Sequence, residues 1–328
     1  MSNRWHKKGW GPHVPSRGDG RWVVHSPEPV GGGGGGVAPD AISGLALWID
    51  PSDAGTVSYS GGASISQIDD KASGVQGRAA GDQYFLAPTA AVEPTMETIN
   101  GRNAIRFAGT AAADYLRLYT TANGLWTQKM HQASTYPGSQ WDGIVGTSEA
   151  VTIVAIIEPV SMTTSGSTST FNHPGILDFA RGYGPGIYEY DRVGGAGNQY
   201  LRMYMYSYNS PYDVYAMRPV PSDGFPVSVG TSTAYACTWR KADPGPLYGV
   251  SALEGGVDLA VAPQSGGETQ TKSYQNYWET KEAYLGLGYS ASFGYCDVRI
   301  GEVCVWNRDL TDGELASMDS YFAGRWGT

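Results

Sequence analysis

The sequence predicts an all-β protein, a sandwich of many short strands closed by a single helix at the C-terminus. Glycine supplies 46 of the 328 residues, tyrosine supplies 22, and hydrophobic residues make up 41% of the chain. Many short strands joined by glycine- and proline-rich turns are typical of sandwiches and barrels. Several segments also alternate apolar and polar residues with a period of two, which is the pattern of a strand with one buried face.

The first 36 residues differ from the rest and predict an extended docking arm with a glycine linker, ahead of a globular domain over residues 37–328. The arm holds five basic residues against two acidic ones, a net charge of +3, whereas the whole chain carries −9. It ends in six consecutive glycines, the least restricted of residues. Tryptophan and arginine dominate binding hot spots, so we expect the arm to order on a partner. The docking residues would be Trp5, Trp10, Arg17, Arg21 and Trp22. The alternative is a disordered terminus or an expression remnant.

The globular part begins with a first strand around Trp48, in which Leu45, Leu47 and Ile49 alternate, followed by turn residues at 50–53. Residues 104–107 and 115–118 predict the next short strands. The almost continuous apolar run at 151–158 predicts a central strand covered on both faces.

Residues 200–208 alternate most sharply and predict a ladder of tyrosines on one face of a strand. Leu201, Met203 and Met205 would face the core, since period two places them on one side. Exposed aromatic rings stack on the flat faces of sugars and their hydroxyls bond to sugar hydroxyls, which favours glycan binding. The candidate glycan-binding residues are Arg202, Tyr204, Tyr206, Tyr208 and Tyr212. Two alternatives stay open: cross-strand aromatic pairs that stabilise the sheet alone, and burial beneath a neighbouring subunit.

The C-terminal segment predicts one long strand and one capped helix. Gly301 interrupts the alternation of residues 297–306, as a β-bulge does. Thr311 and Glu314 have the spacing of a capping box. Apolar residues at helical spacing would pack on the sandwich: Leu315, Met318, Phe322 and Trp326.

The two ends of the globular part carry a family resemblance. Residues 42–53, 65–71 and 99–107 at the front, together with residues 300–308 and the helix after them, are similar to the opening and closing segments of LamG-like, concanavalin-type domains. The resemblance implies a concanavalin-like jelly-roll β-sandwich over about residues 42–328, with its first and last strands close together. It also implies a tendency to bind glycans or proteins, although a fold alone does not define a function.

Catalytic motifs are sparse, and we predict that the protein is not an enzyme. Glycoside hydrolysis needs two carboxylates at a set separation. Glu189 and Asp191 would share one face of a strand, but the third carboxylate that the resemblance leads us to expect is missing. A solvated strand end is therefore preferred, and a glycoside hydrolase on a concanavalin-type fold is kept as the alternative. Neither a nucleophile elbow nor a phosphate-binding loop occurs.

We expect no cofactor, with calcium as an alternative. LamG-like domains can hold Ca²⁺ at the rim of the sandwich, and Asp53, Asp69 and Asp70 lie in expected loops. Three cysteines, Cys237, Cys296 and Cys304, make a poor disulfide framework and predict free thiols. The acidic balance argues against nucleic-acid binding. The best apolar stretch is too short to cross a bilayer, so no membrane insertion is expected.

Taken together, the basic arm, the lectin-like body and the lack of a catalytic set resemble an accessory structural protein of a bacteriophage particle. The arm would dock on a capsid or tail protein, as in a capsid decoration or tail fibre, and the body would bind a host-surface glycan or a neighbouring protein. This implies a virion surface location after synthesis in the host cytoplasm, with a homo-oligomer as one state. The alternatives are a bacterial surface carbohydrate-binding adhesin and the glycoside hydrolase above.

Overall fold

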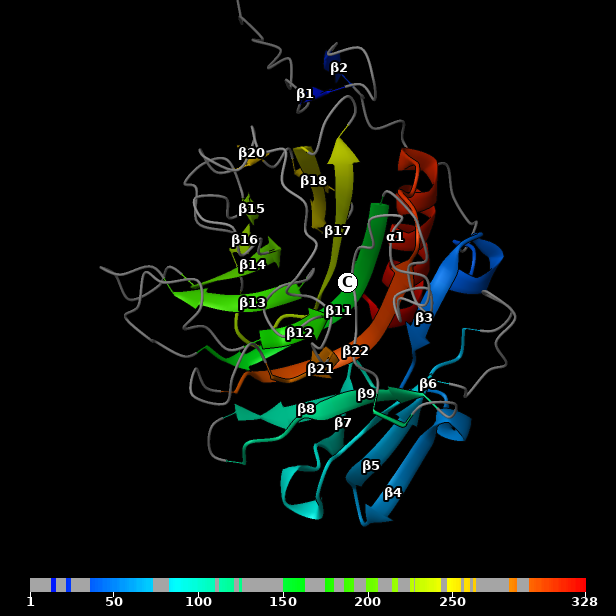
Figure 1. The fold of residues 1–328 in the computed structure, drawn as a ribbon, viewed down its shortest axis with the longest axis vertical. Helices are drawn as coiled ribbons and strands as arrows, with labels where there is room; N and C mark the ends of the chain where they lie inside the picture. Colours follow the sequence, from blue (N-terminus) through cyan, green and yellow to red (C-terminus); the bar gives the residue numbers. More distant parts are fainter. Residues whose placement is uncertain are drawn as a thin grey trace, which may run out of the picture.

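The structure is a computed structural model. It describes backbone and side chains for residues 36–72, 84–109, 112–118, 152–162, 175–177, 228–236, 283–287 and 295–328, and the backbone alone for the strand residues outside these ranges. Most of the described chain is β-structure, in a curled antiparallel sheet with one C-terminal helix (Figure 1). The β-rich class and the terminal helix are therefore confirmed, whereas the jelly-roll sandwich stays a prediction.

A first ladder is centred on β22 (Asp297–Trp306). Its early half pairs with β8 (Arg102–Ala108) and its late half with β3 (Leu45–Ile49), while its other edge pairs with β11 (Ala150–Ser161). The strands that extend this ladder are β7 (Thr95–Ile99) beside β8, and β17 (Thr233–Ala242), β18 (Leu247–Glu254) and β19 (Val257–Leu259) beside β11. The first and last strands of the body thus lie side by side, as the resemblance implies.

A second ladder runs from β4 to β15. Its strands, in pairing order, are β4 (Val57–Gly61), β5 (Ser64–Asp69), β6 (Gln83–Leu86), β9 (Leu116–Thr120), β21 (Ala283–Leu285), β12 (Gly175–Phe179), β13 (Gly186–Asp191), β14 (Gln199–Met205) and β15 (Val214–Met217). The short strands β10 (Gly124–Leu125), β16 (Phe225–Pro226) and β20 (Ala262–Pro263) pair with β9, β14 and β15. A single pair between Ser64 and Thr95 joins the two ladders into one curled sheet.

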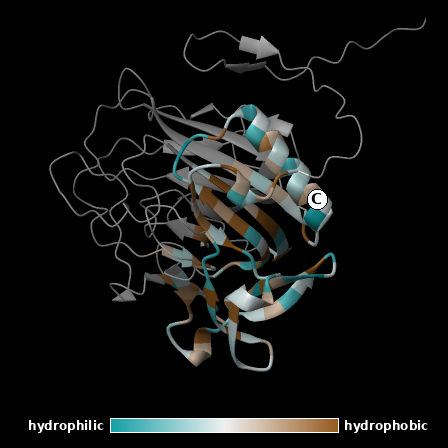
Figure 2. Cartoon of the chain, turned by 90° about the vertical axis from the view of Figure 1, so that its right-hand side faces the viewer, coloured by the Kyte–Doolittle hydropathy of each residue, from teal (hydrophilic) through white to brown (hydrophobic). Residues whose placement is uncertain are grey.

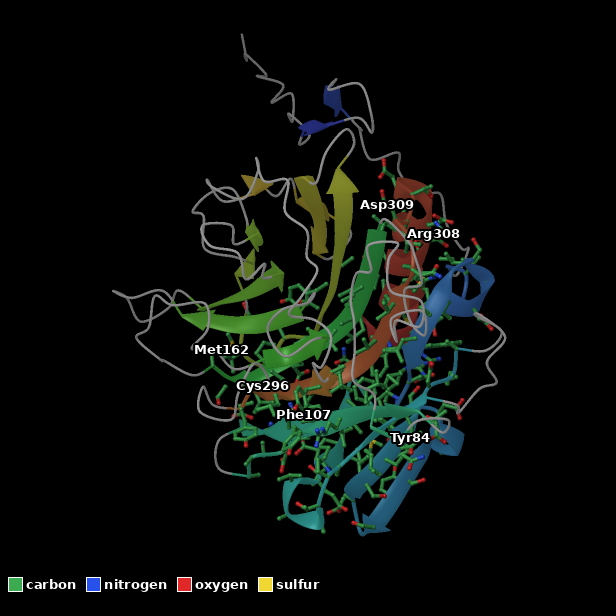
Figure 3. All side chains as sticks on the ribbon, in the orientation of Figure 1. Tyr84, Phe107, Met162, Cys296, Arg308 and Asp309 are labelled. Atoms are coloured by element: carbon green, nitrogen blue, oxygen red, sulfur yellow. The ribbon has the colours of Figure 1, made fainter. Side chains whose placement is uncertain are left out.

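The strand patterns of the sequence explain where the core lies. Residues 152–159 of β11 are buried on both faces, as the apolar run at 151–158 predicts. Figure 2 shows brown, hydrophobic residues along these central strands. Figure 3 places Phe107 on β8, in the middle of the described sheet, where its side chain has no exposed surface.

The predicted bulge and its glycine are confirmed. The register between β11 and β22 shifts between Ala155 and Ile157, opposite Gly301. A Cβ on Gly301 would lie 2.9 Å from Ile156 Cγ2 and 3.0 Å from a ring carbon of Trp326. Only glycine therefore lets the helix approach the sheet at this point.

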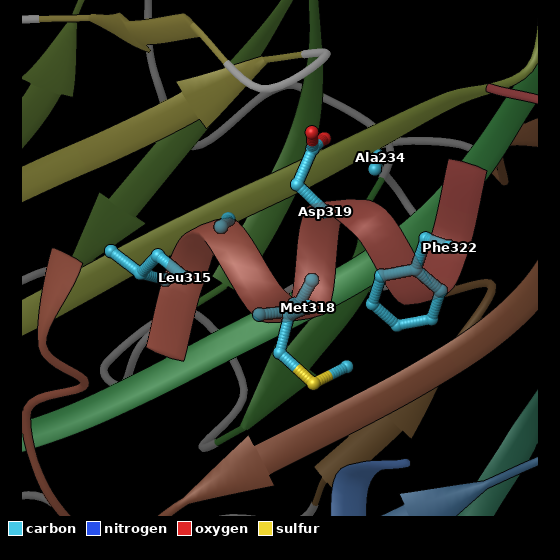
Figure 4. A pocket seen from close by; sticks show the side chains of 7 residues that line it. Ala234, Leu315, Met318, Asp319 and Phe322 are labelled. Carbon is cyan, nitrogen blue, oxygen red and sulfur yellow. The ribbon is translucent and has the colours of Figure 1, made fainter. Parts of the chain in front are cut away.

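The helix α1 (Asp312–Trp326) begins as predicted. Thr311 accepts a hydrogen bond from the backbone N–H of Glu314, whose carboxylate accepts one from the N–H of Thr311 in return. Met318 and Phe322 pack on β11 and β17, and Figure 4 shows the small pocket there, with Asp319 at its edge. Burial raises the pKa of Asp319.

No helix in the described ranges is both long and apolar enough to cross a membrane.

The N-terminal arm contains a short hairpin, in which β1 (His13–Pro15) pairs with β2 (Trp22–Val24). Tryptophan and the two consecutive valines of β2 are residue types that are enriched in strands. At the other end of the linker, Gly36 lies against α1, where a Cβ would come within 2.0 Å of the Ser317 carbonyl oxygen. The division at residue 36 stays a prediction.

Candidate functional site

The best-defined polar cluster in the described chain joins β3, β22 and α1, and we call it the buried clamp. At its centre the Glu302 carboxylate accepts hydrogen bonds from the indole N–H of Trp48 at 2.6 Å and of Trp326 at 2.9 Å. It also accepts from the Tyr321 hydroxyl at 3.2 Å and from Arg325 Nε at 3.1 Å. Four donors from two elements, β3 and α1, therefore converge on one buried acid of β22.

Asp50 is the second carboxylate of the buried clamp. It follows β3 directly and accepts hydrogen bonds from Ser52 Oγ at 2.6 Å, Lys71 Nζ at 2.9 Å and Arg325 at 2.8 Å. Arg325 thus bridges Asp50 and Glu302, while Lys71 lies 4.2 Å from the ring centroid of Trp48.

The two carboxylates have opposite pKa shifts. Burial disfavours the charge of Asp50, but hydrogen bonds from Ser52 and Lys71 and the charge of Arg325 outweigh burial and lower its pKa. Burial and the charge of Asp50 raise the pKa of Glu302. Such divergence can mark an acid–base pair. Both side chains, however, have 0% exposure, so the clamp holds the helix on the sheet rather than meeting a ligand.

The three aspartates proposed for calcium have separate partners. Asp53 pairs with Lys71 at 3.0 Å, Asp70 accepts from the backbone N–H groups of Trp48 and Ala72, and Asp69 accepts from Gln67. Within the described ranges, histidine, cysteine and acidic residues form no group of three that could hold a metal ion. Cys296 and Cys304 both have buried side chains.

The predicted row of tyrosines belongs to β14, a strand of the second ladder. The pairing register of this ladder defines two rows of residue positions, one on each face of the sheet. The inner row pairs Leu116 with Leu285 and Leu285 with Leu177, and these three side chains are at most 1% exposed. The same register continues from Leu177 to Ile187 and from there to Met203. Met203 therefore occupies the row that forms the core, as the alternation of residues 200–208 predicts.

The outer row is the neighbouring line of positions, on the opposite face. It pairs Gln67, Leu86, Arg117, Tyr284, Asp178, Gly186, Tyr204 and Tyr215 in that order across eight strands. Next to it, Tyr188 pairs with Arg202 and Tyr190 with Tyr200. Residues directly opposite in a ladder share a face. Aromatic positions of β13, β14 and β15 therefore gather on one side, which we call the tyrosine face.

One end of the tyrosine face is closed by aromatic packing. Tyr284 is only 6% exposed, and the ring of Tyr115 meets its ring edge-on at a centroid distance of 5.8 Å. Tyr115 also lies 6.2 Å from Tyr295. Figure 3 shows Tyr84 on β6, on the side of Tyr284 away from β13–β15. Any ligand surface therefore lies beyond Tyr284, toward β13–β15.

The predicted glycan-binding residues are only partly covered by the structure. Arg202 and Tyr204 lie in β14, whose backbone alone is described. Tyr206, Tyr208 and Tyr212 lie outside the described residues. Of the docking arm, Trp22 begins β2, while Trp5, Trp10, Arg17 and Arg21 lie outside the described residues. The roles of all these residues remain predictions.

The carboxylate pair of the hydrolase alternative lies in the other row. Glu189 pairs with Leu201 and Asp191 with Gln199, so both positions belong with the inner row and not with the tyrosine face. Sequence reasoning missed the acidic position that does share the tyrosine face, Asp178. Asp178 lies in β12, a short and mainly apolar segment that begins at Gly175. This apolar run was the only signal in the sequence that a strand is present there.

Comparison with known proteins gives distant likenesses only. No model of a known protein family matches the chain, and no curated protein matches it. A mutant of Trypanosoma rangeli sialidase with trans-sialidase activity gives a TM-score of 0.47 at 14% identity, over 87% of this chain and 34% of that one. Domain 4 of AbnA, a GH43 extracellular arabinanase from Geobacillus stearothermophilus, in complex with arabinotriose, gives 0.37 at 14% identity over 84% and 98%. The receptor binding domain of botulinum neurotoxin type G gives 0.36 at 9% identity over 84% and 51%.

These comparisons require one correction. The chain spans about a third of the length of the sialidases. The prediction that the protein is not an enzyme is contradicted by them, because the first structures that resemble it are those of enzymes, and we withdraw it. The structures named above are carbohydrate-related or receptor-binding proteins and include no bacteriophage protein. With TM-scores below 0.5 they assign no activity to this chain.

Proposed function

We propose that this chain is a carbohydrate-binding β-protein and that the tyrosine face of the second ladder is its binding surface. The observation that carries the proposal is the register of β13, β14 and β15, which pairs Tyr190 with Tyr200 and Tyr204 with Tyr215. Adjacent strands thereby bring tyrosine positions together from segments up to 25 residues apart in sequence. A period of two within one strand cannot do this alone.

Sugar chemistry fits these residue types. The C–H faces of a sugar ring are apolar and flat and stack on aromatic rings, while tyrosine hydroxyls both donate and accept hydrogen bonds. The tyrosine face also includes the basic position Arg202 and, beside it on β12, the acidic position Asp178. Neighbouring donors and acceptors of both charges suit a ligand that consists mainly of hydroxyl groups.

Affinity electrophoresis tests this proposal directly. The full chain is run through native gels that contain soluble xylan, arabinan, glucomannan or dextran, and its mobility is compared with a gel without polysaccharide. We expect retardation in at least one gel, and a weaker retardation for Tyr204→Ala. Equal mobility in all gels would refute carbohydrate binding of these classes. Tyr59→Ala is the matched control, because Tyr59 is 44% exposed on β4, away from β13–β15.

The finer part of the proposal is that the carbohydrate-binding body is displayed on the surface of a larger assembly. The basic, tryptophan-rich arm would attach the body to a larger assembly, either the capsid or tail of a bacteriophage particle or a bacterial surface as an adhesin. Attachment can be measured by co-sedimentation of the full chain with particles from the same source. A variant with Trp5, Trp10 and Trp22 replaced by Ala should remain in the supernatant. If this variant pellets with the particles as the parent does, the tryptophans of the arm are not required for attachment.

Glycoside hydrolysis is the second candidate function. It is favoured by Glu189 and Asp191, which occupy alternate positions of β13 and so share a face, as an acid and a base or nucleophile must. Release of reducing sugar by the parent protein and its loss in Glu189→Gln would support this role. The register counts against this role, because both positions lie on the core-forming side of the sheet, and an absence of reducing-sugar release by the parent would remove it.

A further inference from the structure

Asp319 is a half-buried carboxylate on the flank of α1 next to β17. Burial raises its pKa, and no hydrogen bond or ion pair joins it to another residue that the structure describes. Glu314, on the same helix, in contrast pairs with Arg308 at 2.6 Å. The other side chains that line the small pocket beside Asp319 are all apolar (Figure 4). A long side chain with an apolar stem and a cationic head would fill this pocket and neutralise the carboxylate.

The end of the glycine linker is fixed on the same helix. A Cβ on Gly36 would come within 2.0 Å of the Ser317 carbonyl oxygen and 2.4 Å of the Tyr321 nitrogen, so the linker backbone lies directly on α1. The N–H of Val37 also donates to Ser317 Oγ at 3.2 Å. The chain that precedes Gly36 therefore starts from the surface of α1.

Small side chains separate this contact from Asp319 around the helix. Successive residues of an α-helix are about 100° apart, which places Ser320, Ala316 and Ala323 in order between Ser317 and Asp319. Ala316 and Ala323 are exposed. Short side chains let a glycine backbone pass as closely as Gly36 does, so α1 offers an open path from the linker to the small pocket.

The N-terminal arm carries the complementary charge. Residues 1–36 have a net charge of +3 and the rest of the chain has −12, because the whole chain carries −9. The basic residues of the arm that are nearest to the linker in sequence are Arg17 and Arg21. The stretch from Arg21 to Gly36, about 15 residues, spans about 20 Å as a flexible chain. An α-helix is only about 10–12 Å across, so these arginines can reach Asp319.

We propose that the N-terminal arm folds back over α1 and places an arginine of residues 17–21 in the small pocket, where it pairs with Asp319. An arginine supplies both the apolar stem and the cationic head that the pocket requires. The contact does not depend on carbohydrate binding. It stores the arm on the globular part, so a partner that binds the arm must first displace it from α1.

Proteolysis of the full chain tests the contact. Chymotrypsin cleaves after Trp22, and the rate at which this fragment appears is measured by mass spectrometry at low ionic strength. We expect Asp319→Asn to be cleaved about threefold faster than the parent, the effect of losing one partly exposed ion pair. The difference should disappear in 1 M salt, where the Debye length is about 3 Å.

A double-mutant cycle identifies the partner of Asp319. In a chain that carries Arg17→Gln and Arg21→Gln, the cleavage site is the same with and without Asp319→Asn, and the second substitution should no longer change the rate. An acceleration that persists in this background overturns the proposal, as does cleavage of Asp319→Asn at the rate of the parent.

Two controls separate the small pocket from other causes. Asp40→Asn removes an exposed carboxylate close to Gly36 in sequence and should leave the rate unchanged. Equal acceleration by Asp40→Asn would mean that the acidic body attracts the arm without a specific site, which overturns the pocket. Melting temperatures equal to that of the parent show that faster cleavage does not come from unfolding.

The arm variants decide alone if Asp319→Asn does not fold, because they leave the globular part untouched. The chain with Arg17→Gln and Arg21→Gln should then be cleaved about threefold faster than one with Lys7→Gln and Lys8→Gln, which removes the same charge from the far end of the arm. Equal rates of these two chains would overturn the proposal.

Discussion

Replacing Glu302 with glutamine tests whether the buried clamp holds the C-terminal helix on the sheet. The carboxylate accepts from Trp48 and Tyr321 through one oxygen and from Arg325 and Trp326 through the other. A glutamine keeps one acceptor oxygen, but its amide NH₂ then faces two donors. The ion pair with Arg325 is lost at the same time.

The size of the effect follows from burial. Glu302 has no exposed surface, so water cannot replace the missing acceptor. Leaving a buried donor unsatisfied costs about 1–3 kcal/mol, and removing one partner of a buried ion pair costs about 3–5 kcal/mol. Relief of the desolvation that raises the pKa of Glu302 offsets part of this cost. We therefore expect Glu302→Gln to lower the free energy of unfolding by about 3 kcal/mol, near the lower end of the range for ion pairs.

Urea denaturation followed by tryptophan fluorescence measures this change, and Trp48 and Trp326 in the clamp should report it. A loss of about 3 kcal/mol corresponds to a lower melting temperature by about 4–5 °C for a protein of this length. The matched control is Glu97→Gln, which also removes a carboxylate paired with an arginine, but one that is 39% exposed. The control should change stability by less than about 0.5 kcal/mol. Equal effects of the two substitutions would show that the clamp does not stabilise the fold.

Three further substitutions test the contacts around α1 and the bulge. Thr311→Ala removes the N-cap and should cost about 1 kcal/mol in urea denaturation, whereas an unchanged midpoint would show that the capping box is not formed. Gly301→Ala forces a Cβ against Ile156 and Trp326 and should cost about 1–3 kcal/mol in the same measurement, and a neutral result would mean that the bulge can relax. Hydrogen bonds from Arg308, with further ones from Thr311, lower the pKa of Glu314 from 4.5 to about 2, so its contribution to stability is present above pH 4.5 and is lost as the pH falls toward 2. The difference in melting temperature between the parent and Glu314→Gln should therefore shrink across that interval, and a constant difference would contradict the lowered pKa.

Features encoded within a few residues were predicted correctly from the sequence. The capping box needs only Thr311 and Glu314 at the right spacing, and the bulge needs only a glycine that breaks an alternation. The central strand β11 was recognisable because burial on both faces demands a continuous apolar run. In each case the physical cause lies next to the residue that reports it.

Features that depend on distant partners were not predictable in this way. Glu302 was not singled out, because its four donors come from β3 and α1, at positions that only the fold brings together. Gly36 was taken as part of a flexible linker, since nothing in a run of glycines shows that one of them lies against Ser317. Asp178 was missed because its strand is too short to show an alternation.

The placement of the two candidate activities illustrates the same limit. The alternation of residues within β13 and β14 predicts that each strand has two faces. It does not predict which face of β13 lies on the same side of the sheet as which face of β14. The register decides this, because it pairs Tyr188 with Arg202 and Glu189 with Leu201. Tyrosine positions and the carboxylate pair therefore belong to opposite sides of the same strands. Because the carboxylate pair lies on the core-forming side, the register favours binding on the tyrosine face over hydrolysis at Glu189 and Asp191.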